Sequence, residues 1–414
     1  MAVLDQLTSQ QAIDLENKYG AHNYHPLPVV LNRGEGVYVW DVEGKKYYDF
    51  LSAYSAVNQG HCHPKIVGAM MQQAQTLTLT SRAFYNDMLG KYEKFASELF
   101  GFDKLLPMNT GAEAVETALK LSRKWAYEVK GIAENEAQII VCENNFHGRT
   151  TTIISFSNDP VARKNFGPFT NGFIKIEYDN LQALEETLNS DPNIAAFLVE
   201  PIQGEAGVYV PSEGYLTEAK ALCKKHNVLF IADEVQTGIA RTGKMLAVDH
   251  ENVKPDILIL GKALSGGAYP VSGVLADDHI MNVIQPGNHG STFGGNPIAA
   301  AVAIAALEVV QEESLAENAE ALGQLFRAEL SEFAKKSDLV LSVRGKGLLN
   351  AVLINDTEES STAWDICMKL KDNGLLAKPT HGNIIRFAPP LVMNKEQLMD
   401  CVSIIKRTIS EFKS

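Results

Sequence analysis

The chain has 414 residues, of which 45% are hydrophobic, and a formal net charge of −13. This length suggests two or three domains around a large core, and an acidic chain without a Lys/Arg run argues against nucleic acid as a main partner. Five scattered cysteines without a CxxC pair fit a reducing compartment. Neither a membrane span nor a secretory or arginine-rich leader is visible. We therefore expect a cytoplasmic protein.

The middle of the chain alternates short apolar runs with helical patterns. Four runs have the composition of strands that are buried on both faces, at residues 137–144, 194–201, 228–234 and 256–262. Buried strands that alternate with helices predict an α/β fold with a mostly parallel sheet flanked by helices.

The two ends of the chain have a different pattern. Residues 36–50 look like a β-hairpin. After about residue 322 the patterns of helix and strand alternate again. We expect a large domain over residues 53–322 and a smaller α+β domain formed by residues 1–52 and 323–414.

Two of the expected strands end in side chains that can react. Asp233 follows VLFIA, and Lys262 follows DILILG. In an open α/β sheet, ligands bind beyond the carboxyl ends of the strands. The two residues could form a buried ion pair. They could also anchor pyridoxal phosphate, the lysine through a Schiff base and the carboxylate at the pyridine nitrogen.

A candidate phosphate site lies in the segment MNTGAEA. Thr110 and Glu113 have the spacing of a capping box, so a helix begins here. The small residues Gly111 and Ala112 would leave its first N–H groups open to an anion. A well-capped surface helix is the alternative.

Other segments offer weaker candidates. In NNFHGRT, Phe146 could stack on a flat ring and Arg149 could bind a carboxylate, although a core phenylalanine and a surface arginine are the plainer interpretation. Thr292 lies in a loop of small residues, GSTFGGNP, that feeds a helix. The two histidines of GHCHP have no third ligand nearby, and we expect no metal.

Together these segments resemble the class III, fold-type I pyridoxal-phosphate aminotransferases over nearly the whole chain. Within that family they are most similar to the members that act on ornithine. The motifs that carry the resemblance are YGAHNYHPLPVVL, FLSAYSAVNQGHCHP, LTSRAFYND, MNTGAEA, VEPIQGEAGV, LFIADEVQTG, ARTGK, LGKALSGG, GNHGSTFGGNP, VRGKGLLNA and NGLLAKPTHGNIIRFAPPL.

The resemblance implies a role for each matching cofactor residue. Lys262 would hold the cofactor covalently and transfer the proton, Asp233 would pair with the pyridine nitrogen, and Gln236 would lie near the phenolic oxygen. The remaining implied cofactor residues are Gly111 and Ala112 at the phosphate, Phe146 on the ring, and Thr292 at the phosphate of the partner subunit. The last role implies a homodimer with shared active sites.

The resemblance also implies how two unlike substrates use one site. Ornithine reacts at its terminal amine and has no carboxylate beside the reacting carbon, whereas glutamate has one there. Glu205 would mask Arg386, which binds that proximal carboxylate, and would release it for the acidic substrate. Arg149 would hold the distal carboxylate. Tyr24 and Tyr54 would line the far end of the site, where the α-amino and carboxylate groups of ornithine lie.

The implied reaction is ping-pong transfer of the δ-amino group of L-ornithine to 2-oxoglutarate, giving L-glutamate 5-semialdehyde and L-glutamate, in arginine metabolism and proline biosynthesis. His147 leaves an alternative open, because some ornithine enzymes have tryptophan there and FHGRT is common in aminotransferases for N-acetylornithine and 4-aminobutyrate. An aminomutase would need no oxo-acid acceptor, and a non-catalytic protein of this fold would take up no cofactor.

Overall fold

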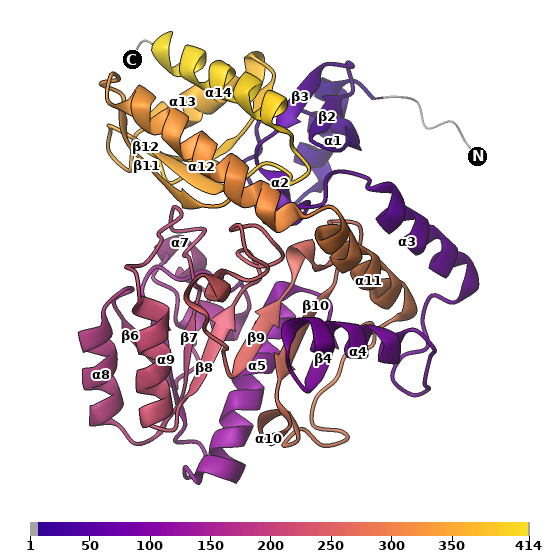
Figure 1. Cartoon of the computed structure of the whole chain (residues 1–414), viewed down its shortest axis with the longest axis vertical. Coiled ribbons are helices and arrows are strands. Elements are labelled where there is room, and N and C mark those ends of the chain that lie inside the picture. The colour runs from indigo at the N-terminus through magenta and orange to yellow at the C-terminus, as the bar shows by residue number, and fades with distance from the viewer. Residues whose placement is uncertain (1–6, 413–414) are drawn as a thin grey trace.

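The computed structural model describes residues 7–412; residues 1–6 and 413–414, which belong to the expected small domain, lie outside the described residues. One large sheet with its helices occupies the lower part of the molecule in Figure 1, and two smaller sheets with their helices occupy the upper part.

The large sheet has seven strands in the order β4-β10-β9-β8-β7-β5-β6. β10 is antiparallel to both of its neighbours, and all other pairs are parallel. The prediction of a mostly parallel sheet is therefore confirmed, and the four strands expected from the sequence are β5, β7, β8 and β9. The strands are β4 (Lys104–Met108), β5 (Gln138–Cys142), β6 (Phe173–Ile176), β7 (Ile194–Val199), β8 (Leu229–Asp233), β9 (Ile257–Leu260) and β10 (Ser272–Ala276).

The core lies on both faces of this sheet, because side chains alternate between the faces along each strand. In β5, Ile139 and Val141 belong to the cluster that packs under α5, whereas Ile140 and Cys142 belong to the cluster under α8, α9 and α11. The helices around the sheet are α3 (Pro64–Thr76), α4 (Leu89–Phe100), α5 (Gly111–Trp125) continued by a π-helical turn (Ala126–Lys130), α6 (Thr151–Ser155), α7 (Pro160–Arg163), α8 (Leu181–Ser190), α9 (Tyr215–Lys225), α10 (Asp278–Met281) and α11 (Pro297–Glu312).

The two ends of the chain meet in the upper part of the molecule. The expected hairpin is present, and its strand β3 pairs in parallel with β13 from the C-terminal region. The sheets are β1-β2-β3-β13 and β11-β12-β15-β14. Their strands are β1 (Leu31–Glu35), β2 (Tyr38–Asp41), β3 (Lys46–Asp49), β11 (Val340–Lys346), β12 (Leu349–Ile354), β13 (Leu375–Leu376), β14 (Lys378–Thr380) and β15 (Ile384–Phe387).

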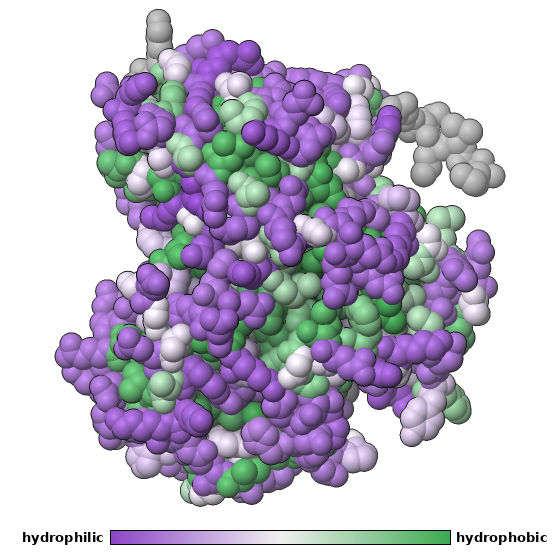
Figure 2. All heavy atoms as spheres, viewed as in Figure 1, coloured by the Kyte–Doolittle hydropathy of each residue, from purple (hydrophilic) through white to green (hydrophobic). Residues whose placement is uncertain are grey.

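The helices of the upper part complete the fold. They are α1 (Ser9–Tyr19), α12 (Leu315–Ala334), α13 (Thr362–Asp372) and α14 (Lys395–Ser410), and the short turn α2 (Ser52–Ser55) leads from β3 toward the large sheet. The expected boundary at residue 322 falls inside α12. Among the helices within residues 7–412, none is both long and apolar enough to cross a membrane. Figure 2 shows hydrophobic side chains gathered at mid-height on this face, between two largely hydrophilic ends.

Candidate active site

The carboxyl ends of six strands of the large sheet point the same way. β4 is antiparallel to β10, which is antiparallel to β9, so β4 runs with β5, β6, β7, β8 and β9. A cavity of about 200 Å³ lies at this edge, where ligands of open α/β sheets bind. It is lined by Gly111, Ala112, Phe146, His147, Gly148, Glu200, Asp233, Val235, Gln236, Thr237 and Lys262. The structure thus brings together six of the seven predicted cofactor residues.

Lys262 begins a 3₁₀ turn (Lys262–Ser265) that is separated from β9 by Gly261, and it has a φ of 46°. A left-handed backbone is uncommon for a lysine, and such strain collects at functional sites. Burial lowers the pKa of its amine, although the Glu205 and Asp233 carboxylates oppose that shift. Within residues 7–412 the amino group has no hydrogen-bond or ion-pair partner. It is therefore available, and the lower pKa favours its reactive neutral form.

Asp233 is held on both of its oxygens. Its Oδ2 lies 2.6 Å from Nδ1 of His147, and its Oδ1 accepts a hydrogen bond of 3.0 Å from the Val235 N–H. Burial alone would lower the pKa of His147, but the bond to Asp233 outweighs it and raises the pKa. From the sequence, His147 was expected to bear only on substrate preference; its pairing with Asp233 spans 86 residues and has no local signal in the sequence.

Glu200 is a second residue that the sequence analysis missed. It follows β7 directly and accepts a 2.9 Å hydrogen bond from the Phe146 N–H. Burial raises its pKa to about 7. A signal was present, because an acid directly after a buried strand is the same pattern that singled out Asp233.

The N-terminus of α5 closes one side of the cavity. The predicted capping box is confirmed, since Thr110 Oγ1 accepts from the Glu113 N–H at 3.2 Å and the Glu113 carboxylate accepts from the Thr110 N–H at 2.9 Å. A Cβ placed on Gly111 would lie 2.9 Å from a methyl of Val235. Only glycine therefore fits between the helix and the segment after Asp233, and this leaves the helix N-terminus facing the cavity as an anion site.

These residues fit pyridoxal phosphate. An unpaired amine suits an aldehyde, a fixed carboxylate suits a protonated ring nitrogen, and a bare helix N-terminus suits a phosphate. In this arrangement the groups are Lys262, Asp233 and the first turn of α5.

A second ion pair lies beside the cavity. Nη1 of Arg386, on β15, is 2.7 Å from Oε1 of Glu205, which also accepts a 3.2 Å hydrogen bond from Gln236. Burial alone would raise the pKa of Glu205, but Arg386 outweighs it and the pKa is lowered. The Arg386 side chain is 5% exposed and the Glu205 side chain 26% exposed. The predicted masking pair is thus present as a contact, with the carboxylate as its accessible member.

Tyr54 lies on a strained turn next to this pair. Its ring centre is 5.2 Å from the guanidinium carbon of Arg386. Ser52, Ala53, Tyr54 and Ser55 have φ values of 47°, 47°, 61° and 70°, so α2 is a left-handed turn. Each non-glycine residue in that conformation costs about 1–2 kcal/mol. The surrounding structure must therefore hold this turn in place.

Three predicted site residues lie on the open surface of the described chain. Tyr24 is 73% exposed, Thr292 is exposed and absent from the cavity lining, and the Arg149 side chain is 57% exposed and lies 3.3 Å from Asp159. The guanidinium of Arg149 is also 5.5 Å from the ring of Phe146, at the edge of the cavity. Arg149 therefore borders the site, whereas Tyr24 and Thr292 stay exposed among residues 7–412.

The histidines of GHCHP have other partners. His61 contacts Asp49 at 2.7 Å, and His63 contacts Glu313 at 2.9 Å. Across residues 7–412, no group of three or more His, Cys, Asp or Glu side chains is arranged to hold a metal ion.

A sequence profile described as "Aminotransferase class-III" matches residues 19–409, and the chain belongs to this family of pyridoxal-phosphate enzymes. It is 66% identical over 394 residues to "Ornithine aminotransferase, mitochondrial" of Drosophila melanogaster, covering 95% of this chain and 90% of that one. The ornithine aminotransferase structure from Toxoplasma gondii has a TM-score of 0.96 at 51% identity, covering 98% of this chain and 95% of that one. A structure described as acetylornithine aminotransferase from Elizabethkingia anophelis has a TM-score of 0.91 at 68% identity, covering 98% and 100%. The predicted family and fold-type I architecture are confirmed.

The expectation of a cytoplasmic protein is wrong. The Drosophila melanogaster relative is named mitochondrial, as are three further relatives, and these names point to the mitochondrion. The expectation rested on the scattered cysteines and on the lack of a visible membrane span or leader. Scattered cysteines fit any reducing compartment, so they do not single out the cytoplasm.

Proposed function

We propose that this enzyme is an ornithine δ-aminotransferase, which converts L-ornithine and 2-oxoglutarate to L-glutamate 5-semialdehyde and L-glutamate. The observation that carries the proposal is the Glu205–Arg386 pair beside the cofactor cavity. The family match and the high identity to ornithine aminotransferases support it.

The residues around the cavity have distinct tasks in this reaction. When bound, pyridoxal phosphate supplies the ring that takes up the electron pair of the breaking C–H bond. Lys262 would carry the proton between the two carbons, and its lowered pKa keeps the amine able to accept one. Asp233, fixed by His147 and the Val235 N–H, would hold a positive charge at the ring nitrogen. Phe146, Gln236, and the N-terminus of α5 at Gly111 and Ala112 would orient the ring and phosphate.

The Glu205–Arg386 pair would select between the two substrates. While it is closed, no free cation lies beside the reacting carbon, which suits the δ-carbon of ornithine. For 2-oxoglutarate or glutamate, Glu205 swings away and Arg386 binds the proximal carboxylate. Tyr24 and Tyr54 would hold the far end of ornithine, and Arg149 the distal carboxylate of the acidic substrates. A released Glu205 can reach water, because its side chain is already partly exposed.

A second candidate is an aminotransferase for another ω-amine, N-acetylornithine or 4-aminobutyrate. Two observations favour it: the identity to the acetylornithine-named structure, and His147 in the FHGRT segment. Side-by-side measurement of kcat/KM for the three amines, with 2-oxoglutarate as acceptor, separates the candidates. A higher kcat/KM for L-ornithine supports the proposal, and a higher value for either other amine replaces it.

We also propose that the chain works as a homodimer with shared sites. The loop that carries Thr292 and Phe293 is exposed in one chain. So are Phe84 and Tyr85 in a separate segment before α4, with Tyr85 fully exposed. Large exposed aromatic groups favour an interface, and a second copy would bring Thr292 to the partner's phosphate. Sedimentation of the holoenzyme tests the dimer, and Thr292→Val should weaken cofactor binding.

The division of the chain follows the same proposal. Residues 53–322 would form the cofactor-binding domain, and residues 1–52 and 323–414 the small domain that brings Arg386 to the site. The reaction would connect arginine metabolism with proline biosynthesis.

A further inference from the structure

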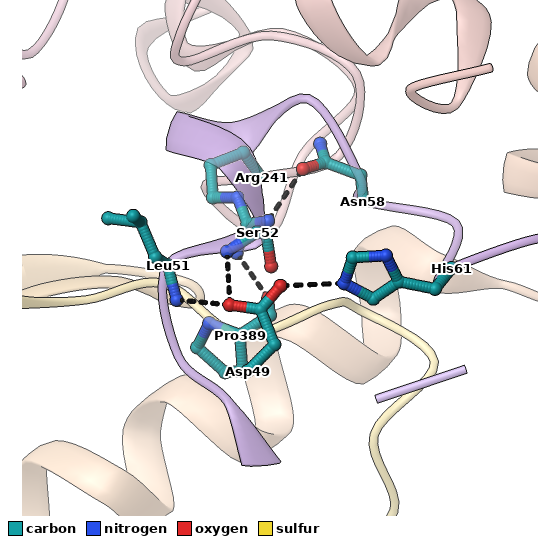
Figure 3. Close-up of polar contacts among 7 residues, drawn as sticks. All are labelled: Asp49, Leu51, Ser52, Asn58, His61, Arg241 and Pro389. Carbon is teal, nitrogen blue, oxygen red and sulfur yellow. Dashed lines mark hydrogen bonds and ion pairs between the residues drawn. The ribbon is translucent and has the colours of Figure 1, made fainter. Parts of the chain in front are cut away.

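The left-handed turn that carries Tyr54 is held by a carboxylate that the proposed mechanism does not use. Asp49 is the last residue of β3 and is 7% exposed. Its Oδ1 accepts hydrogen bonds from the Leu51 N–H at 2.8 Å and the Ser52 N–H at 2.9 Å, the two donors where the turn begins (Figure 3). One oxygen therefore fixes the entry of the chain into the strained segment.

The other oxygen of Asp49 fixes the carboxylate itself. Oδ2 lies 2.7 Å from Nε2 of His61, whose ring comes from the segment that follows the turn (Figure 3). With both oxygens engaged, the Asp49 side chain has one orientation. The residues before and after the turn are thereby tied to the end of β3.

A buried cation stands next to this carboxylate. Arg241 is fully buried and donates to the carbonyl of Leu348 at 2.9 Å, to the carbonyl of Pro389 at 2.6 Å, and to Oδ1 of Asn58 at 2.5 Å. Burial lowers the pKa of Arg241, and the Asp49 charge opposes that shift. Asp49 thus also compensates a guanidinium whose direct partners are uncharged.

The contacts of Asp49 and Arg241 lie close in sequence to both proposed substrate residues, Tyr54 and Arg386. Pro389 follows Arg386 by three residues on the chain, and it is bound to Arg241. Tyr54 is three residues beyond Leu51, which is bound to Asp49. Contacts of Asp49 and Arg241 thus lie within three residues of both Tyr54 and Arg386, whose ring and guanidinium are 5.2 Å apart.

We propose that Asp49 is a positioning residue for substrate recognition, which holds the Ser52–Ser55 turn so that Tyr54 faces the amine substrate beside Arg386. Without the two hydrogen bonds to Oδ1, the four left-handed residues relax and the Tyr54 ring moves. The proposal rests on the proposed role of Tyr54 in binding ornithine.

A double-mutant cycle on the holoenzyme tests it, with Asp49→Ala, Tyr54→Ala and the double variant. We expect Asp49→Ala to raise the KM for L-ornithine about tenfold, with kcat and cofactor affinity changed by less than about twofold. In the Tyr54→Ala background the same change should raise the KM by less than about twofold, because the residue it positions is gone. An unchanged KM, or an equal rise in both backgrounds, would overturn the proposal.

Two matched variants separate positioning from general damage. Asp49→Asn keeps an oxygen for the Leu51 and Ser52 N–H groups, so the KM should stay within about threefold of the wild type. His61→Ala keeps both of those hydrogen bonds but releases Oδ2, so its rise in KM should lie between those of Asp49→Asn and Asp49→Ala. If Asp49→Ala does not fold, Asp49→Val takes its place, since its side chain is of similar size and has no acceptor for the two N–H groups. An equal loss in Asp49→Asn and Asp49→Ala contradicts positioning through Oδ1.

The cycle also distinguishes failure of the proposed function. A wild type that does not use L-ornithine contradicts the function, and the cycle is then measured with the ω-amine that the enzyme does use. A Tyr54→Ala variant with unchanged KM for the accepted amine overturns the positioning proposal itself.

Discussion

Two carboxylate–cation pairs flank the cavity. The distance between the partners is nearly the same in both, but the pairs differ in burial and in the elements that carry them. Asp233 and His147 are 2.6 Å apart; Asp233 is the last residue of β8, and His147 lies in the loop after β5. Glu205 and Arg386 are 2.7 Å apart, and Arg386 comes from β15 in another sheet. The first pair is enclosed, with side chains 0% and 5% exposed, whereas Glu205 is 26% exposed.

This difference in burial indicates which pair can open during the reaction. An enclosed pair has no other partner, so opening it leaves a buried charge, which costs several kcal/mol. A carboxylate that already reaches solvent can exchange its partner for water at lower cost. The enclosed Asp233–His147 pair, here called the inner pair, therefore suits a constant charge at the cofactor ring. The Glu205–Arg386 pair, here called the outer pair, suits a switch between substrates.

The largest effect should come from Lys262, which lines the cavity. Lys262→Ala removes both the covalent link and the proton carrier, and activity should fall by at least about 10⁴-fold. The visible absorption of the bound cofactor should change at the same time. Lys244→Ala, at an exposed lysine, is the control and should keep both. Residual activity above about one per cent in Lys262→Ala would contradict the assignment.

Arg386 tests the outer pair next. Arg386→Met removes the cation for the proximal carboxylate, and the KM for 2-oxoglutarate should rise about 100-fold. The KM for L-ornithine should change far less, since ornithine is bound with the pair closed. Arg163→Met serves as the control, because this arginine contacts the carbonyls of Ile154, Ser155 and Ser157 and the ring of Phe169 and does not line the cavity. Equal rises in both KM values would mean that Arg386 does not discriminate.

Glu205 should have a smaller and opposite effect. Glu205→Ala leaves Arg386 permanently free, so glutamate should gain about tenfold over L-ornithine as the first donor. The ratio of kcat/KM for the two donors measures this change. A ratio equal to that of the wild type would exclude the masking role.

The smallest effect concerns the pH dependence of stability, to which Glu200 contributes. Glu200 has a pKa of about 7 in the folded protein, against an ordinary value of 4.5. Between these values the folded protein holds a proton that the unfolded chain has released, so the free energy of unfolding falls as pH rises through this window, by at most about 1.4 kcal/mol per pH unit.

Glu200→Gln should remove this contribution. Its Tm should decline less between about pH 5 and about pH 8 than that of the wild type, measured without cofactor at one protein concentration. Glu218→Gln, on the exposed face of α9, should decline as the wild type does. Parallel curves for Glu200→Gln and the wild type would contradict the raised pKa.

The sequence predicted the inner part of the site better than the outer part. Asp233 and Lys262 were found because a polar residue after a buried strand points to the ligand-binding edge of a parallel sheet, and the same pattern at Glu200 was overlooked. Arg386 and Glu205 were named only through a family resemblance, since their contact joins residues 181 positions apart.

Some features could not be derived from the sequence in any local way. The left-handed turn at Tyr54 consists of ordinary residues that prefer other conformations, and its stabilising bonds to Asp49 depend on how β3 ends. The strands β4, β6 and β10 were also absent from the predictions. Their positions in the sheet are set by pairing with distant strands, which composition does not encode.

The most direct test of the account is the visible absorption spectrum of the purified holoenzyme before and after L-ornithine is added without any oxo-acid. The account predicts that L-ornithine alone converts the cofactor absorption to that of its aminated form, and that 2-oxoglutarate then restores the original spectrum. A cofactor band that L-ornithine leaves unchanged, while N-acetylornithine or 4-aminobutyrate converts it, would contradict the proposed substrate.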